Sequence, residues 1–131
     1  MDFQEITLAQ DFEAARAAVV TALADEGFGI ITQIDMHDTF KAKLGVDFRP
    51  YTILGACNPQ IALSAVSAAP AIGLLLPCNV TVEQVDGGTL VRIPDAEAVL
   101  SGGDVSDAPE LKDPAADAGA RLDRVVAALR G

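Results

Sequence analysis

The stretch YTILGACNPQIALSAVSAAPAIGLLLPCNV, Tyr51 to Val80, decides the fold of this chain. It contains no charged residue, although 21% of the chain is charged, and it holds both cysteines. The uncharged run extends from Pro50 to Val82, 33 residues, which is longer than a helix needs to cross a bilayer. Four prolines interrupt it and no Lys or Arg cluster flanks it, so we expect no membrane span.

Cut at its prolines, this run predicts a strand, a helix, a turn and a second strand. The first strand covers 51–56, and Asn58 followed by Pro59 is typical of a helix start, because Asn caps free amides and Pro suits the first helical position. The helix ends at Pro70. A strand over 79–85 then turns through the glycines of 86–88 into a partner strand over 89–93.

Upstream of this run, the pattern predicts four further elements. They are a short strand over 3–7, a helix capped by Asp11 and ended by Gly27, a strand over 28–35, and one or two helical turns over 37–45. In the strand over 28–35, alternation places one set of side chains on one face and Gly29, Ile31 and Gln33 on the other. The first set is Phe28, Ile30, Thr32 and Ile34.

The C-terminal third mixes helical and loop signals. A short helical turn over 95–100 is followed by acids, serines, glycines and prolines, so we expect a mobile acidic loop over 101–114. The end is helical, with apolar side chains at helical spacing and arginines in its last turns.

The order β-α-β-(α)-β-α-β-β-α favours an α+β fold, an antiparallel sheet with helices packed on one face. A parallel doubly wound sheet is the alternative, and it is less favoured because no glycine-rich phosphate turn follows any strand. The chain has 131 residues and is 50% hydrophobic, so residues 1–131 can form a single domain with one core.

Composition limits the partners and the compartment. The formal net charge is -10, which repels phosphate backbones and anionic lipids, so we expect neither nucleic acid nor membrane as a partner. The N-terminal residues MDFQEITLAQ lack the basic start of a secretory signal, and only two cysteines are present. We therefore expect a soluble protein of a reducing cytoplasm.

Four blocks of the sequence, in order, resemble one known family. They are EGFGIITQIDMHDTFKAKLG, YTILGACNP, GLLLPCNVTV and IPDAEAVL. These resemble the family catalogued as domain of unknown function 302 over essentially the whole chain. The resemblance implies a TATA-box-binding-protein-like α+β fold in a single copy, the formation of dimers, and no established activity. Similarity of fold to a DNA-binding protein does not imply DNA binding here, given the charge.

The two cysteines are the candidate site. Cys57 ends one strand and Cys78 begins a later one, so antiparallel neighbours would bring both thiols to one end of the sheet. Cys57 also precedes the predicted helix start, where the positive end of the helix dipole would favour a thiolate. Asn58, Pro59, Pro77 and Asn79 would support this site. The alternative is that both thiols are simply buried small hydrophobic groups.

His37 is the only histidine, and a metal site formed by His37, Cys57 and Cys78 is a weaker hypothesis. In a meander, His37 would fall near the start of the strand over 51–56, away from Cys57. No C-x-x-C spacing is present either. We expect no cofactor, and a histidine exposed near a helix start is the plainer interpretation.

Two functional hypotheses follow. The first is a non-enzymatic homodimeric module that binds a small apolar ligand or a protein partner, with the uncharged run forming the core, a pocket wall and the dimer interface. The second is a thiol-dependent redox or metal-handling protein that uses Cys57 and Cys78. No catalytic motif favours an enzyme.

Overall fold

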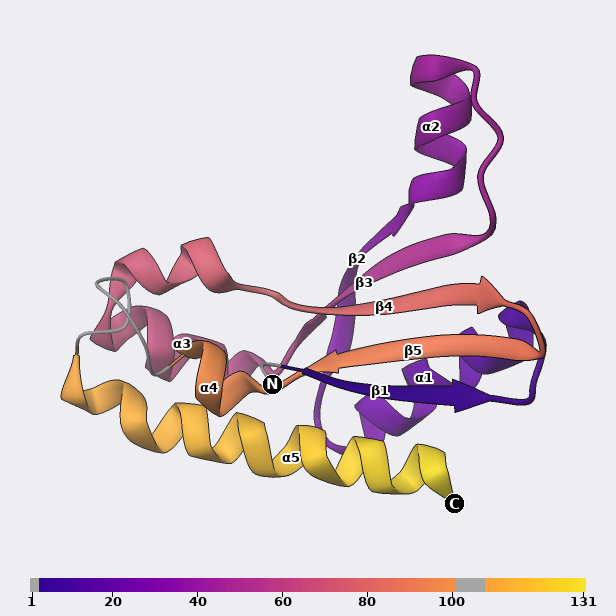
Figure 1. Ribbon diagram of the computed structural model, residues 1–131. Helices are drawn as coiled ribbons and strands as arrows, with labels where there is room; N and C mark the ends of the chain where they lie inside the picture. Colours follow the sequence, from indigo (N-terminus) through magenta and orange to yellow (C-terminus); the bar gives the residue numbers. More distant parts are fainter. Residues whose placement is uncertain (1–2, 101–107) are drawn as a thin grey trace.

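The computed structural model describes residues 3–100 and 108–131 (Figure 1). The elements in chain order are β1 (Phe3–Leu8), α1 (Phe12–Asp25), β2 (Gly29–Asp35), α2 (Met36–Leu44), β3 (Tyr51–Cys57), α3 (Pro59–Ala68), the 3-10 helix η1 (Pro70–Leu75), β4 (Cys78–Val85), β5 (Gly88–Pro94), α4 (Ala96–Leu100), the 3-10 helix η3 (Pro109–Leu111) and α5 (Lys112–Arg130).

The five strands form one antiparallel sheet in the order β1-β5-β4-β3-β2. The predicted α+β class and element order are confirmed, and η1 occupies the place of the predicted turn after Pro70. The β4–β5 hairpin closes through a short loop in which Gly87 has a φ of 86°. Such a positive φ suits glycine, which explains why the sequence signal for this hairpin was strong.

Two helix caps predicted from the sequence are present. The Asp11 carboxylate accepts a hydrogen bond from the backbone N–H of Ala14 at 2.9 Å, and Gly27 follows α1 with a φ of 83°. The Asn58 side-chain oxygen accepts from the N–H of Ile61 at 3.2 Å, with Pro59 as the first residue of α3. These caps satisfy amides that a helix start leaves without partners.

Helices α1 and α5 pack against one face of the sheet, which we call the covered face (Figure 1). Strand residues on this side alternate with those on the other, and those in the middle of β3, β4 and β5 are almost fully buried. The fully buried strand side chains of this face include Leu54, Val80, Val82, Val91 and Ile93. The opposite side of the sheet, which we call the open face, carries Tyr51, Ile53, Glu83 and Arg92 by the same alternation.

The predicted face assignment of β2 is wrong after Ile31. The register shifts between Ile30 and Thr32, so that Ile30 lies opposite Ala56 but Thr32 lies opposite Gly55. Since Ala56 and Gly55 face opposite sides, Thr32 and Ile34 lie on the open face instead of sharing the side of Ile30. An extra residue at a β-bulge reverses the alternation beyond it, which a simple count along the sequence cannot detect.

Helix α2 stands apart from the other helices, at the far end of β2 and β3 (Figure 1). None of its residues is buried, and it ends at Gly45, which has a φ of 66°. The sequence predicted one or two turns here, and the helix has nine residues. It therefore contributes to the surface rather than to the core.

The last part of the range predicted as an acidic loop is helical. Residues 101–107 of that range lie outside the described residues, but η3 begins at Pro109 and α5 at Lys112. The helix therefore replaces the last part of the range 101–114, because Leu111 and Ala115 are buried against the core. Among residues 3–100 and 108–131, no helix is long and apolar enough to cross a membrane.

Candidate functional site

Both cysteines lie at the same end of the sheet. Strand β3 ends at Cys57, and the antiparallel strand β4 begins at Cys78. Cys78 lies beside the end of β3, because its partner across the ladder is Ala56, the residue before Cys57. Neither thiol is in a disulfide, and each is half-buried. The sequence predicted this proximity from topology alone, and the register explains it.

An apolar cavity of about 260 Å³ opens beside the two thiols. It is bounded by the ends of β3 and β4, by α3 and η1, and by single residues of α4 and α5. The lining residues contain no charged side chain, and Asn58 contributes the one side-chain amide. They are Phe28, Ile31, Ala56, Cys57, Asn58, Ile61, Ala62, Ala65, Val66, Gly73, Leu76, Pro77, Cys78, Leu100 and Ala118.

The residues predicted to support the thiols have different positions. Asn58 and Pro77 line the cavity, and Asn58 also caps α3 as described above. Pro59 begins α3 and is exposed, whereas Asn79 is exposed and lines a smaller neighbouring hollow with Pro77 and Cys78. Asn58 and Pro77 are thus part of the cavity wall, and Pro59 positions the helix that forms it.

The environment of Cys78 keeps its thiol neutral. Burial raises the pKa of Cys78 to about 11, and the neighbouring Cys57 adds to this increase. At neutral pH a thiol with this pKa is almost entirely protonated, and the protonated form is a poor nucleophile. Cys78 therefore acts as an apolar wall of the cavity under these conditions.

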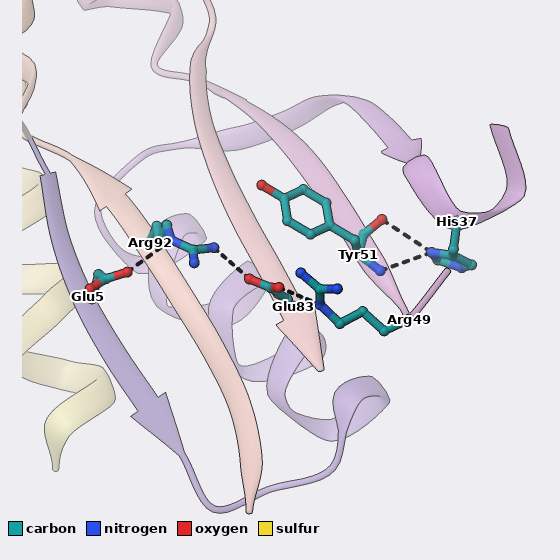
Figure 2. Close-up of polar contacts among 6 residues, drawn as sticks. All are labelled: Glu5, His37, Arg49, Tyr51, Glu83 and Arg92. Atoms are coloured by element: carbon teal, nitrogen blue, oxygen red, sulfur yellow. Dashed lines mark hydrogen bonds and ion pairs between the residues drawn. The ribbon is translucent and has the colours of Figure 1, made fainter. Parts of the chain in front are cut away.

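His37 is far from the thiols along β3. Its Nδ1 accepts a hydrogen bond from the backbone N–H of Tyr51 at 3.0 Å, at the start of the strand that Cys57 ends (Figure 2). The described part of the chain contains no group of three or more His, Cys, Asp or Glu side chains that could hold a metal ion. The predicted ligand set of His37, Cys57 and Cys78 is therefore not brought together.

A row of ion pairs on the open face was missed by the sequence reasoning (Figure 2). Glu83 accepts from Arg49 Nε at 2.6 Å and from Arg92 Nη1 at 2.8 Å, and Arg92 Nε donates to Glu5 at 2.9 Å. Glu83 is only 4% exposed, although it carries a charge. Burial tends to raise the pKa of Glu83, but the hydrogen bonds and charges of Arg92 and Arg49 outweigh it and hold the pKa below its usual value.

A sequence signal for this row did exist. Arg49 and Glu83 are the charged residues immediately before and after the uncharged run, and Tyr51 lies opposite Glu83 in the β3–β4 ladder. An uncharged segment that begins with one strand and ends with the antiparallel neighbour of that strand places the charged residues at its two ends close together. The opposite signs of those charges indicated a pair.

Comparison with known proteins identifies the family. The family model described as domain of unknown function DUF302 matches residues 4–129. The crystal structure of an uncharacterized conserved DUF302 protein from Bacillus stearothermophilus is 28% identical, has a TM-score of 0.85, and each chain covers 99% of the other. No curated protein matches the chain. The chain belongs to the DUF302 family, and its resemblance to that family is confirmed.

Proposed function

We propose that this DUF302 protein is a homodimeric binding module, without catalysis, for a small uncharged apolar ligand. The supporting observation is the cavity of about 260 Å³ whose lining contains no charged side chain. Apolar cavities of about 150 Å³ already bind benzene. A charged ligand would lose its hydration in this cavity without gaining an ion pair, so hydrocarbon or aromatic molecules fit it best.

Ligand-induced stabilisation tests this proposal. Toluene at saturating concentration should raise the unfolding temperature of the wild-type protein, because a ligand that binds only the folded state stabilises it. Two substitutions of lining residues should fill the cavity: Ala62→Phe on α3, and Gly73→Leu on η1, where an added Cβ would meet no atom within 4 Å. Both variants should lose the increase in unfolding temperature.

The matched control is Ser64→Phe, an exposed position on the same helix that does not line the cavity. It should keep the full response to toluene. A wild-type protein without any response, or equal responses in all variants, would end this proposal.

The dimer interface that we propose lies on the exposed side of the uncharged run. Leu63 on α3 and Leu74 on η1 are 70% and 80% exposed. Large exposed apolar side chains within an uncharged segment are typical of an interface with a second copy. Light scattering should find a dimer at micromolar concentration, and the double change Leu63→Glu with Leu74→Glu should give monomers.

Leu44→Glu is the control for this experiment, because Leu44 is similarly exposed but lies on α2. It should remain dimeric. A monomeric wild-type protein, or a Leu44→Glu variant that dissociates as readily as the double variant, would contradict the proposed interface while leaving the ligand proposal intact.

The second candidate function is thiol-dependent, and it is favoured by one observation: Cys57 and Cys78 line the same cavity. A redox or metal-handling role requires at least Cys57 to react in the folded protein. Thiol counting under native and then denaturing conditions measures this. If neither thiol reacts before unfolding, and the Cys57→Ser and Cys78→Ser variants still respond to toluene, the thiol role is excluded.

A further inference from the structure

A second cavity lies on the open face of the sheet, at the base of α2. It has a volume of about 330 Å³ and is lined by Met36, Phe40, Phe48, Tyr51 and Ile53. Tyr51 and Ile53 belong to β3 and alternate with the buried Thr52 and Leu54, so this cavity is on the side opposite the covered face. It is therefore separate from the cavity beside the two cysteines.

Three aromatic rings give this cavity its character. Phe40 and Phe48 meet edge to face with ring centroids 5.2 Å apart, and Phe48 and Tyr51 do the same at 6.5 Å. Edge-to-face pairs leave ring faces available to a further flat molecule, which can stack or insert its edge. An aromatic ligand ring suits such a wall better than a branched aliphatic group does.

Arg49 supplies a cationic group at the same place. Its guanidinium carbon lies 4.3 Å from the centre of the Phe48 ring, and its Nε donates to Glu83 at 2.6 Å. The side chain is still 52% exposed. No partner for its two terminal nitrogens is found among residues 3–100 and 108–131, so they can form the two parallel hydrogen bonds that a guanidinium gives to a carboxylate.

Glu83 holds Arg49 in position and is itself held. Each of its carboxylate oxygens accepts from a different arginine, one from Arg49 and one from Arg92, and Arg92 is anchored in turn by Glu5 (Figure 2). The row of four residues is electrically balanced. A ligand anion could therefore bind the terminal nitrogens of Arg49 while Glu83 keeps both of its hydrogen bonds.

From this arrangement we infer that the open face binds a small aromatic carboxylate, with the ring in the cavity formed by Met36, Phe40, Phe48, Tyr51 and Ile53 and the carboxylate on Arg49. This site is independent of the apolar-ligand cavity. The two cavities differ in chemistry. The cavity beside the cysteines has no charged side chain in its lining, whereas the open-face cavity has an aromatic lining beside the guanidinium of Arg49.

The chain carries its own reporter for this site. Tyr51 is the only tyrosine and there is no tryptophan, so the intrinsic fluorescence of the protein comes from the wall of this cavity. Phenylacetate is a suitable probe, because it combines a ring with a carboxylate. Titration should give a saturable change in Tyr51 emission, and the uncharged analogue phenylacetamide should bind at least about tenfold more weakly, since a charge-assisted hydrogen bond is lost.

The decisive variant is Arg49→Gln, which removes the charge and leaves the pair between Arg92 and Glu83. It should weaken phenylacetate binding at least about tenfold, with little change for phenylacetamide. Arg49→Lys keeps the charge but cannot form two parallel hydrogen bonds to a carboxylate, so its affinity for phenylacetate should lie between those of wild type and Arg49→Gln. Arg124→Gln is the matched control, because Arg124 is a similarly exposed, ion-paired arginine on α5.

The inference is overturned by either of two results. One is a wild-type protein whose Tyr51 emission does not change saturably with phenylacetate. The other is an equal loss of affinity for phenylacetate in Arg49→Gln and Arg124→Gln, or a wild-type protein that binds phenylacetamide as tightly as phenylacetate. Ala62→Phe should leave phenylacetate binding unchanged, so failure here and failure of the apolar-ligand proposal are distinguished by separate variants.

Discussion

The two faces of the sheet bury their side chains by different means. On the covered face, helices α1 and α5 exclude water from aliphatic residues such as Leu54 and Val82. On the open face, Glu83 reaches 4% exposure beneath neighbouring side chains, and two arginines balance its charge. The covered face therefore depends on hydrophobic burial and the open face on ion pairing, and their candidate sites differ in the same way.

The largest expected effect compares adjacent residues of β3 on opposite faces. Leu54→Ala should lower the free energy of unfolding by about 3 kcal/mol, because Leu54 is 0% exposed and truncation leaves a cavity in the core. Ile53→Ala on the open face should cost about 1 kcal/mol, because Ile53 is only half-buried. Urea unfolding measures both, and equal losses would contradict the contrast between the faces.

The second prediction concerns Gly55, where the open face is closely packed. A Cβ at this position would overlap the Thr32 hydroxyl and lie 2.9 Å from Pro77 Cγ. Gly55→Ala should therefore destabilise the protein by about 2 kcal/mol. Adding Thr32→Ala should recover part of this loss, and a double variant no more stable than Gly55→Ala would show that Thr32 is not the obstacle.

The third prediction concerns the pH dependence of the stability that Glu83 contributes on the open face. The folded pKa of Glu83 is held below its usual value by Arg92 and Arg49 despite burial, so its contribution to stability is present above the unfolded pKa of about 4.3 and is lost as pH falls through the folded pKa. Glu83→Gln should cost about 1–2 kcal/mol at pH 7.

The stabilities of Glu83→Gln and wild type should begin to converge below the unfolded pKa and should meet as pH falls through the folded pKa. Some acid sensitivity should persist in the variant, because a hydrogen bond from Thr52 also lowers the pKa of Asp35. Parallel stability profiles of the two proteins from pH 7 to pH 3 would contradict the role given to Glu83.

The smallest expected effect is at Thr81, between Ile53 and Arg92 on the open face. Its hydroxyl is buried, and no hydrogen-bond partner for it is found in the described part of the chain. Thr81→Val should stabilise the protein by about 0.5–1 kcal/mol, because it removes an unsatisfied polar group without changing the shape of the side chain. Thr7→Val, at an exposed position of β1, is the control and should change little.

Local sequence signals predicted much of the covered side. The caps at Asp11 and Asn58 and the glycines of the β4–β5 hairpin each act within a few residues, so their meaning does not depend on the rest of the fold. The convergence of Cys57 and Cys78 followed from strand order alone. The cavity beside them required the packing of α3 and η1, which no local pattern specifies.

The open side was harder to predict because its features depend on distant residues. The bulge in β2 places Thr32 against Gly55 of the neighbouring strand, and it reverses the face of every later residue of β2. The pair of Arg49 with Glu83 joins residues 34 positions apart. Helix α2 has no buried residue, so hydrophobic periodicity could not indicate that it stands apart from the other helices.

Diffraction from crystals soaked in iodobenzene tests the central claim, the apolar ligand cavity, most directly. Iodine scatters anomalously, so its position can be located without assumptions about the ligand pose. We predict an iodine peak in the cavity between Cys57, Ala62 and Leu100 of the wild-type protein, and none there in Gly73→Leu. An empty cavity in the wild-type crystals, or the same peak in Gly73→Leu, would contradict the claim.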